Sequence, residues 1–173
     1  MAQRSATIGG DPARPGVRLE RSLALPPADL WLSLTDRSRL AAWFPCDVEV
    51  AGARWEPGAG ILFTFPPEVI EMTLTGSVIT VDEPAELAYS WGDEVLRFQV
   101  FADSEGSRLV LVNELAPAHA ARNAAGWESC LDRLEGREPS TDDWREDFAR
   151  YRDAFEPVLG PQEGPPADYK GET

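Results

Sequence analysis

The chain has 173 residues, enough for one domain with a substantial core, and 43% of them are hydrophobic, which excludes wholesale disorder. Its formal net charge is −14, with 16 basic residues scattered among 30 acidic ones, so we expect no nucleic-acid partner. No apolar run approaches the roughly 20 residues of a membrane span, and no apolar signal core stands near Met1. We therefore expect a cytoplasmic protein with no membrane partner.

The two ends of the chain differ in composition from its middle. Residues 1–16 and 157–173 are rich in Gly, Pro and small polar residues and show no apolar period, so we interpret them as disordered N-terminal and C-terminal tails. Between them we expect a single domain over residues 17–156, made of a core over 17–136 and an extra helix over 141–156.

The front of this domain predicts a strand and two short helices. Apolar residues alternate with polar ones from residue 17 to 25, and Arg21 falls on the inward-facing parity. Pro27 is suited to the first turn of a short helix. A second short helix is expected to begin near Asp36 and to stop at Pro45, which has no N–H to donate.

From residue 46 to 115 the pattern changes to short strands separated by turn residues, as in Asp82-Glu83-Pro84 and Trp91-Gly92-Asp93. The spacing leaves no room for crossover helices, so it predicts an antiparallel meander joined by hairpins. One face of these strands is apolar and aromatic. We place Glu71 and Glu94 on the opposite, outward-facing parity.

A helical stripe after Pro117 should cover that face, since apolar residues from Ala120 to Leu134 recur at steps of three and four and Gly136 offers a stop. Gly126 in mid-helix costs about 1 kcal/mol relative to Ala, which predicts a close approach of helix and sheet at that point.

Beyond Pro139, Ser140 or Thr141 is suited to cap a further helix. The apolar stripe of this helix either packs back on its own domain or is the contact surface of a homodimer. The stripe consists of Trp144, Phe148, Tyr151 and Phe155.

This order of elements resembles the helix-grip fold of the birch-pollen-allergen and START-like superfamily, also labelled SRPBCC. It is similar in particular to the family of heat-shock-protein-90 ATPase activator homologues, which is polyketide cyclase-like. The resemblance rests on short motifs such as Leu40-Ala41-Ala42-Trp43-Phe44, Leu87-Ala88-Tyr89-Ser90-Trp91 and Gly126-Trp127. It implies an α+β domain in which a curved antiparallel sheet wraps a long C-terminal helix, with two short helices after the first strand. It also implies a hydrophobic cavity between sheet and helix.

Aromatic and polar residues on the inward parity are the candidates for lining such a cavity, although each aromatic side chain could instead fill the core. Buried polar groups need partners, so Arg21, Tyr89 and Asn113 either pair within the protein or orient a ligand. The ligand-binding candidates are Arg21, Trp43, Phe63, Phe65, Met72, Tyr89, Trp91, Phe98, Asn113 and Trp127.

Few reactive side chains are present. His119 is the only histidine. Cys46 and Cys130 show no spacing typical of metal ligands, and we interpret them as buried thiols. No nucleophile or phosphate-loop motif occurs in the sequence. We therefore assign no catalytic residue, metal or cofactor, and whether the protein is an enzyme stays open, with the balance against it.

Three hypotheses of function remain. The leading one is a cytoplasmic protein that binds an apolar or aromatic small molecule in the cavity. The second is a protein-interaction module resembling the co-chaperone activators. The third is a cyclase- or hydrolase-like enzyme that uses Tyr89, Asn113, Arg21 and a buried acid with a shifted pKa.

Overall fold

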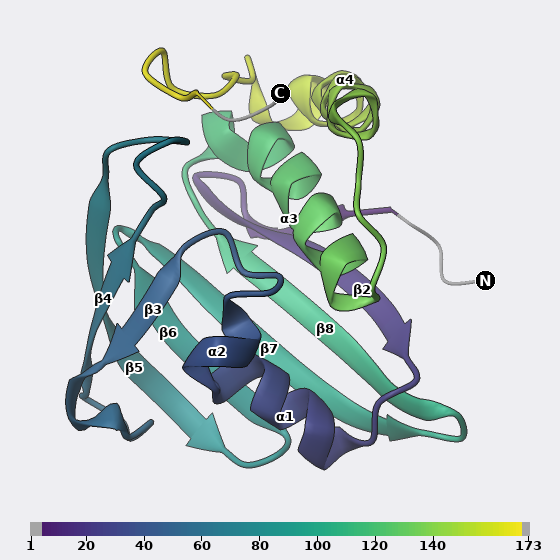
Figure 1. Ribbon diagram of the computed structural model, residues 1–173. Coiled ribbons are helices and arrows are strands. Elements are labelled where there is room, and N and C mark those ends of the chain that lie inside the picture. Colours follow the sequence, from purple (N-terminus) through teal and green to yellow (C-terminus); the bar gives the residue numbers. More distant parts are fainter. Residues whose placement is uncertain (1–4, 171–173) are drawn as a thin grey trace.

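A curved antiparallel sheet that grips a long helix forms the body of the protein (Figure 1). The structure, a computed structural model, describes residues 5–170. Its sheet has eight strands in the order β1-β2-β8-β7-β6-β5-β4-β3, so every neighbouring pair except β2 and β8 is consecutive in the chain. The strands are β1 (Thr7–Asp11), β2 (Arg14–Leu23), β3 (Asp47–Val50), β4 (Gly60–Thr64), β5 (Thr73–Asp82), β6 (Glu86–Trp91), β7 (Glu94–Asp103) and β8 (Gly106–Glu114).

Four helices lie on the concave side and at one end of the sheet (Figure 1). The first helix packs on β7 and β8, the second lies beside β3, and the long third helix crosses β2. Among the described residues, no helix is long and apolar enough to span a membrane. The helices are α1 (Pro27–Thr35), α2 (Arg37–Leu40), α3 (Ala120–Leu134) and α4 (Thr141–Leu159), with 3-10 turns at Ala51–Ala53 and Pro117–His119.

The predicted α+β helix-grip fold is confirmed, and the local signals explain it. Alternation along β2 buries every second residue, Arg21 among them. Asp36 accepts a hydrogen bond from the backbone N–H of Arg39 and so caps α2. At the end of α3, Gly136 adopts φ +85°, and the N–H groups of Gly136 and Arg137 donate to the carbonyls of Arg133 and Asp132. This Schellman geometry stops the helix where the sequence predicts.

The expected close approach at Gly126 is wrong. A Cβ placed on Gly126 would meet no atom within 4 Å, so the helix backbone does not touch the sheet there. Gly126 faces open space instead.

Helix α4 begins with a capping box in which Ser140 and Asp143 each accept from the other's backbone N–H. Tyr151 and Phe155 are buried, and α4 packs along α3. Within this chain the apolar stripe therefore packs back on its own domain.

Neither predicted tail is free of structure. Residues 7–11 form β1, which pairs with β2 through a tight turn in which Asp11 accepts from the N–H of Ala13. Most of β1 is exposed, so it is held by backbone hydrogen bonds rather than by a buried face. Its sequence therefore shows no apolar alternation that would predict a strand. At the other end α4 continues to Leu159, and residues 160–170, the C-terminal strap, fold back over α3. The remaining parts of both tails, 1–4 and 171–173, lie outside the described residues.

Side-chain and backbone hydrogen bonds attach the strap. The Gln162 side chain accepts from the N–H of Ala121 and donates to the carbonyl of Pro117. Farther along, the N–H of Lys170 donates to the carbonyl of Val69 in the β4–β5 connection. The strap therefore connects the start of α3 to the β4–β5 connection.

Candidate functional site

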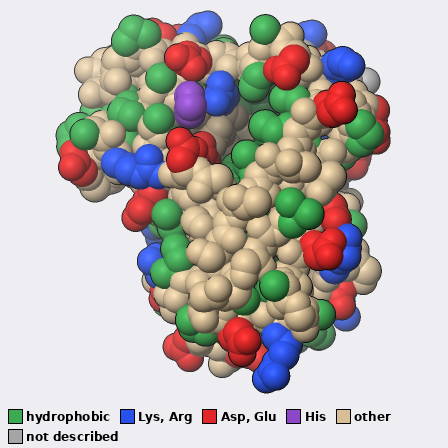
Figure 2. Space-filling view, turned by 90° about the vertical axis from the view of Figure 1, so that its left-hand side faces the viewer, with side chains coloured by type: hydrophobic (Ala, Val, Ile, Leu, Met, Phe, Trp, Pro, Cys, Tyr) green, Lys and Arg blue, Asp and Glu red, His purple; other side chains and the backbone are tan. Residues whose placement is uncertain are grey.

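A cavity of about 470 Å³ lies along one face of α3, and no residue of α1 or α2 lines it. Its walls come from the β4–β5 connection, the β6–β7 turn, one face of α3, the start of α4 and the C-terminal strap. Figure 2 shows the hollow in the upper half of the molecule, with hydrophobic side chains around it and the single histidine at its rim.

The apolar part of the wall is aromatic. The rings of Trp91 and Trp127 lie 5.6 Å apart between centroids, and Phe65 stands 6.1 Å from Trp91. Met72, on the β4–β5 connection, lines the same wall. These four residues were ligand-binding candidates from the sequence, and the fold brings them together. Gly126 also lines the cavity, so its missing side chain leaves space there.

Four other aromatic candidates lie in the core instead. Trp43 donates its indole N–H to the carbonyl of Ser33 at 2.9 Å, and Phe63 and Phe98 pack on either side of Tyr89, at 5.9 and 5.8 Å. All four are at most 2% exposed and none lines the cavity. The Tyr89 hydroxyl makes no hydrogen bond with the described residues, and burial raises the pKa of Tyr89 well above its ordinary value.

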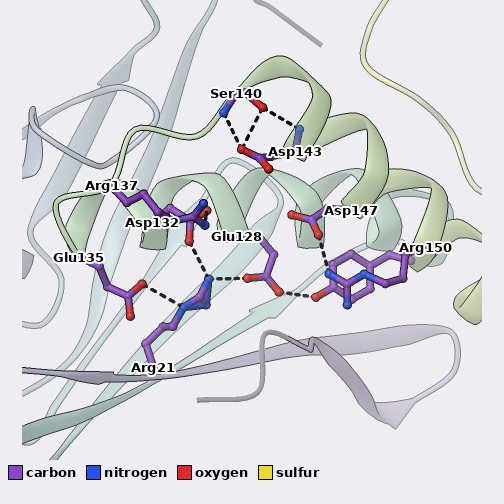
Figure 3. Close-up of polar contacts among 10 residues, drawn as sticks. Arg21, Glu128, Asp132, Glu135, Arg137, Ser140, Asp143, Asp147 and Arg150 are labelled. Carbon is purple, nitrogen blue, oxygen red and sulfur yellow. Dashed lines mark hydrogen bonds and ion pairs between the residues drawn. The ribbon is translucent and has the colours of Figure 1, made fainter. Parts of the chain in front are cut away.

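Arg21 also lies outside the cavity, in a buried ionic cluster between β2, α3 and α4 (Figure 3). Its guanidinium is 2.5 Å from Glu128 and 3.3 Å from Asp132. Arg137 pairs with the second oxygen of Asp132, and the Tyr151 hydroxyl donates to Glu128. Of the two interpretations left open by the sequence, pairing within the protein is the one found here, and Arg21 fastens the helices to the sheet.

Asn113 is fully buried behind the cavity wall and organises it without lining it. Its Oδ1 accepts from the indole N–H of Trp127 and from the Nδ2 of Asn123, both at 3.0 Å. Its Nδ2 donates to Glu94 at 3.1 Å. The side chain of Asn113 therefore connects an aromatic wall residue to a carboxylate.

Glu94 is the site residue that the sequence analysis missed. It was placed on the outward parity, but it stands two residues before Leu96 on β7 and therefore faces inward with it, into the cavity. Its carboxylate accepts from Asn113 and, at 3.2 and 3.0 Å, from Asn123. Burial raises the pKa of Glu94, and nearby Asp93 adds to this, against the hydrogen bonds from both asparagines and the charge of Arg122.

Three basic side chains that line the cavity pair with neighbouring groups. Arg122 donates to the carbonyl of Gly164 at 2.9 Å, His119 lies 3.3 Å from Glu163, and Arg133 lies 3.1 Å from Glu138. Among the described residues, no group of three His, Cys, Asp or Glu side chains is arranged to hold a metal ion.

Cys130 lines the cavity, and both Cys130 and Cys46 are free and buried. Burial raises the pKa of each thiol to about 12, so neither carries thiolate near neutral pH.

The sheet that grips α3 and the cavity beside this helix define a helix-grip protein, which has a ligand-binding fold. The chain belongs to the family described as Activator of Hsp90 ATPase homolog 1-like protein, whose model matches residues 24–137. No curated protein sequence matches the chain.

Solved structures agree with the fold. A conserved protein of unknown function from Enterococcus faecalis is 18% identical with a TM-score of 0.76, over 91% of this chain and 94% of that one. CalU16 from Micromonospora echinospora is 17% identical with a TM-score of 0.67, over 90% and 96%. DynU16, from the dynemicin biosynthetic locus, is 22% identical with a TM-score of 0.59, over 70% of this chain and 46% of that one. At these identities the similarity extends to the fold alone.

Proposed function

We propose that the protein binds an apolar or aromatic small molecule in the cavity beside α3, as a cytoplasmic binding protein. The observation that carries the proposal is the aromatic wall of Phe65, Trp91 and Trp127 around about 470 Å³ of space. Small-molecule sites usually enclose roughly 300–1,000 Å³ and combine apolar walls with a few polar groups. The free thiols of Cys46 and Cys130 fit a reducing compartment.

Gly126 supports this proposal independently. A glycine inside a helix costs stability, and here no close packing compensates, because a Cβ at Gly126 would meet nothing within 4 Å. The only space it preserves is that of the cavity, which it lines. A binding protein gains from that space, whereas a protein with an incidental hollow does not.

The protein-interaction alternative has less support. An interaction module needs a contiguous exposed apolar patch. The exposed large hydrophobic residues are instead spread over α1, β4, β5, β7 and α4, and Arg108 stacks over one of them, Phe101, at 4.3 Å.

The enzyme alternative loses its three named residues, because Tyr89, Arg21 and Asn113 do not line the cavity. It keeps one specific observation in its favour: Glu94 is a cavity-lining acid whose pKa burial raises, as general acid–base catalysis requires. If a ligand co-purifies chemically altered by the wild-type protein but unaltered by Glu94→Gln, the enzyme alternative replaces simple binding.

The first test is the tryptophan emission of the purified protein during titration with naphthalene-based ligands, because Trp91 and Trp127 stand in the wall. We expect saturable quenching in the wild type. Gly126→Leu should fill the cavity and abolish the quenching, whereas Ala154→Leu, which places a leucine at an exposed position of α4, should leave it intact.

Native mass spectrometry of protein purified from its own cells completes the test. We expect an extra mass that denaturation releases and that the Gly126→Leu variant lacks. Quenching that survives Gly126→Leu, or the same bound mass in both variants, would contradict binding in this cavity and favour the interaction alternative.

A further inference from the structure

We propose that the cavity selects ligands in which a flat apolar body carries a primary ammonium group, and that Glu94 receives this group beside the indoles of Trp91 and Trp127. This inference rests on the proposed function and adds the chemistry of the ligand's head. It assigns Glu94 as the specificity-determining residue of the site.

The β6–β7 hairpin places the carboxylate next to an aromatic ring. Trp91 ends β6 and Glu94 begins β7, and the two residues are directly paired across the hairpin. Residues paired in this way project from the same face of the sheet, with Cβ atoms roughly 4.5–5.5 Å apart. Gly92, at φ +64°, allows the tight two-residue turn that closes this pair. An ammonium group bonded to Glu94 would therefore lie close to the indole of Trp91, and the faces of indoles attract cations.

The orientation of the carboxylate is fixed from behind. An indole N–H only donates, so the bond from Trp127 forces Oδ1 of Asn113 toward α3 and leaves Nδ2 to face Glu94. Asn123 donates to the same carboxylate and also to Asn113. The three side chains form a closed network whose polarity requires an acceptor at position 94. The site is thus organised around an acceptor oxygen at position 94, which the carboxylate of Glu94 supplies.

The hydrogen bonds to Glu94 come from neutral amides and supply no positive charge, although the charge of Arg122 acts on it through space to lower its pKa. Among residues 5–170, no ion pair includes Glu94. Arg122 itself donates to the strap carbonyl of Gly164 and lies 4.0 Å from Glu163. The half-buried carboxylate of Glu94 has lost part of its hydration, and a charged donor replaces that hydration better than a neutral one, which favours an ammonium ligand.

The test uses three probes with the same ring system: 1-naphthylmethylamine, 1-naphthalenemethanol and 1-naphthoic acid. Isothermal titration calorimetry at pH 7 gives their affinities for the wild type, for Glu94→Gln and for Glu71→Gln. Glu71 is the matched control, because it receives the same substitution at an exposed position of the β4–β5 connection. A charged hydrogen bond implies a tenfold to roughly hundredfold effect.

We expect the wild type to bind the amine at least tenfold more tightly than the alcohol, and the acid most weakly. Glu94→Gln should weaken amine binding about tenfold to hundredfold while alcohol binding changes less than threefold. Glu71→Gln should behave as the wild type. Far-UV circular dichroism of each variant confirms that it is folded.

A pH series on the wild type tests the same site without a mutation. Lowering the pH protonates Glu94 and should weaken binding of the amine but not of the alcohol. The series is repeated in His119→Asn, which removes the imidazole from the comparison. The other charged groups at the cavity or its rim are Asp93, His119, Arg122, Arg133, Glu138 and Glu163.

The outcomes separate this inference from the function on which it rests. Equal affinity for all three probes, or tightest binding of the acid, would overturn the ammonium preference and leave ligand binding standing. An equal effect of Glu71→Gln would show a general charge effect and also overturn it. Failure of every probe to bind would overturn both proposals.

Discussion

Replacing Arg21 by methionine tests whether the buried ionic cluster holds the helices on the sheet. Methionine has a similar length and apolar stem but no charge, so the variant leaves the carboxylates of Glu128 and Asp132, each 1% exposed, without the guanidinium between them. Removing one partner of a buried ion pair costs about 3–5 kcal/mol. Because Tyr151 still donates to Glu128 and Arg137 still pairs with Asp132, we expect the lower end, about 3 kcal/mol.

Urea unfolding followed by tryptophan emission measures this cost, and six tryptophans give a strong signal. Since domains of 150–250 residues lose roughly 2–4 °C in Tm per kcal/mol, the melting temperature should fall by about 6–12 °C. The matched control is Arg18→Met on the same strand, where the pair with Glu20 is 45% and 38% exposed. An exposed pair contributes about 0–1 kcal/mol, so this variant should remain close to wild type.

A double variant identifies the cause. If the cost of Arg21→Met comes from an uncompensated carboxylate, adding Glu128→Gln should restore part of the lost stability. The reasoning is refuted if Arg21→Met costs no more than Arg18→Met, or if the double variant is less stable than Arg21→Met alone.

Three further predictions concern single features of the fold. Gly126→Ala should raise the free energy of unfolding by about 0.5–1 kcal/mol, because the added Cβ meets no other atom. Gly136→Ala should lower the free energy of unfolding, because Gly136 holds φ +85°. Effects of the same sign in urea melts would contradict this. Burial raises the pKa of both thiols to about 12, so iodoacetamide should label neither Cys46 nor Cys130 in the native protein between pH 7 and 9. In urea it should label both. A labelling rate of the native protein that grows with pH as for a free thiol would contradict this burial. Tyr151→Phe removes the acceptor of the Ala6 N–H and a donor to Glu128, so it should cost about 1–3 kcal/mol and speed hydrogen exchange at Ala6, while Tyr169→Phe in the strap should leave that exchange unchanged.

The periodic parts of the fold could be predicted from the sequence because packing imposes the period. Alternation placed Arg21 inward on β2, and steps of three and four predicted the buried face of α3. The edge strand β1 and the strap could not be predicted from the sequence, because backbone hydrogen bonds and a few polar side chains hold them in place rather than an apolar stripe.

The site was harder to predict than the fold. Parity tells which face a side chain takes but not what lies above it, so Phe63 and Phe98, which lie in the core, could not be distinguished from Phe65 and Trp91, which line the cavity. Glu94 was within reach of the sequence, because it shares the parity of Leu96.

The C-terminal strap has a consequence for comparing members of this family. The family match ends at residue 137, yet Thr141, Trp144, Pro165 and Tyr169 all belong to the cavity wall. Substitution, shortening or replacement of these segments would reshape the cavity while leaving every matched residue intact. Two relatives with superimposable cores can thus differ in the shape of the cavity, so the sequence after residue 137 is where differences in ligand should be sought first.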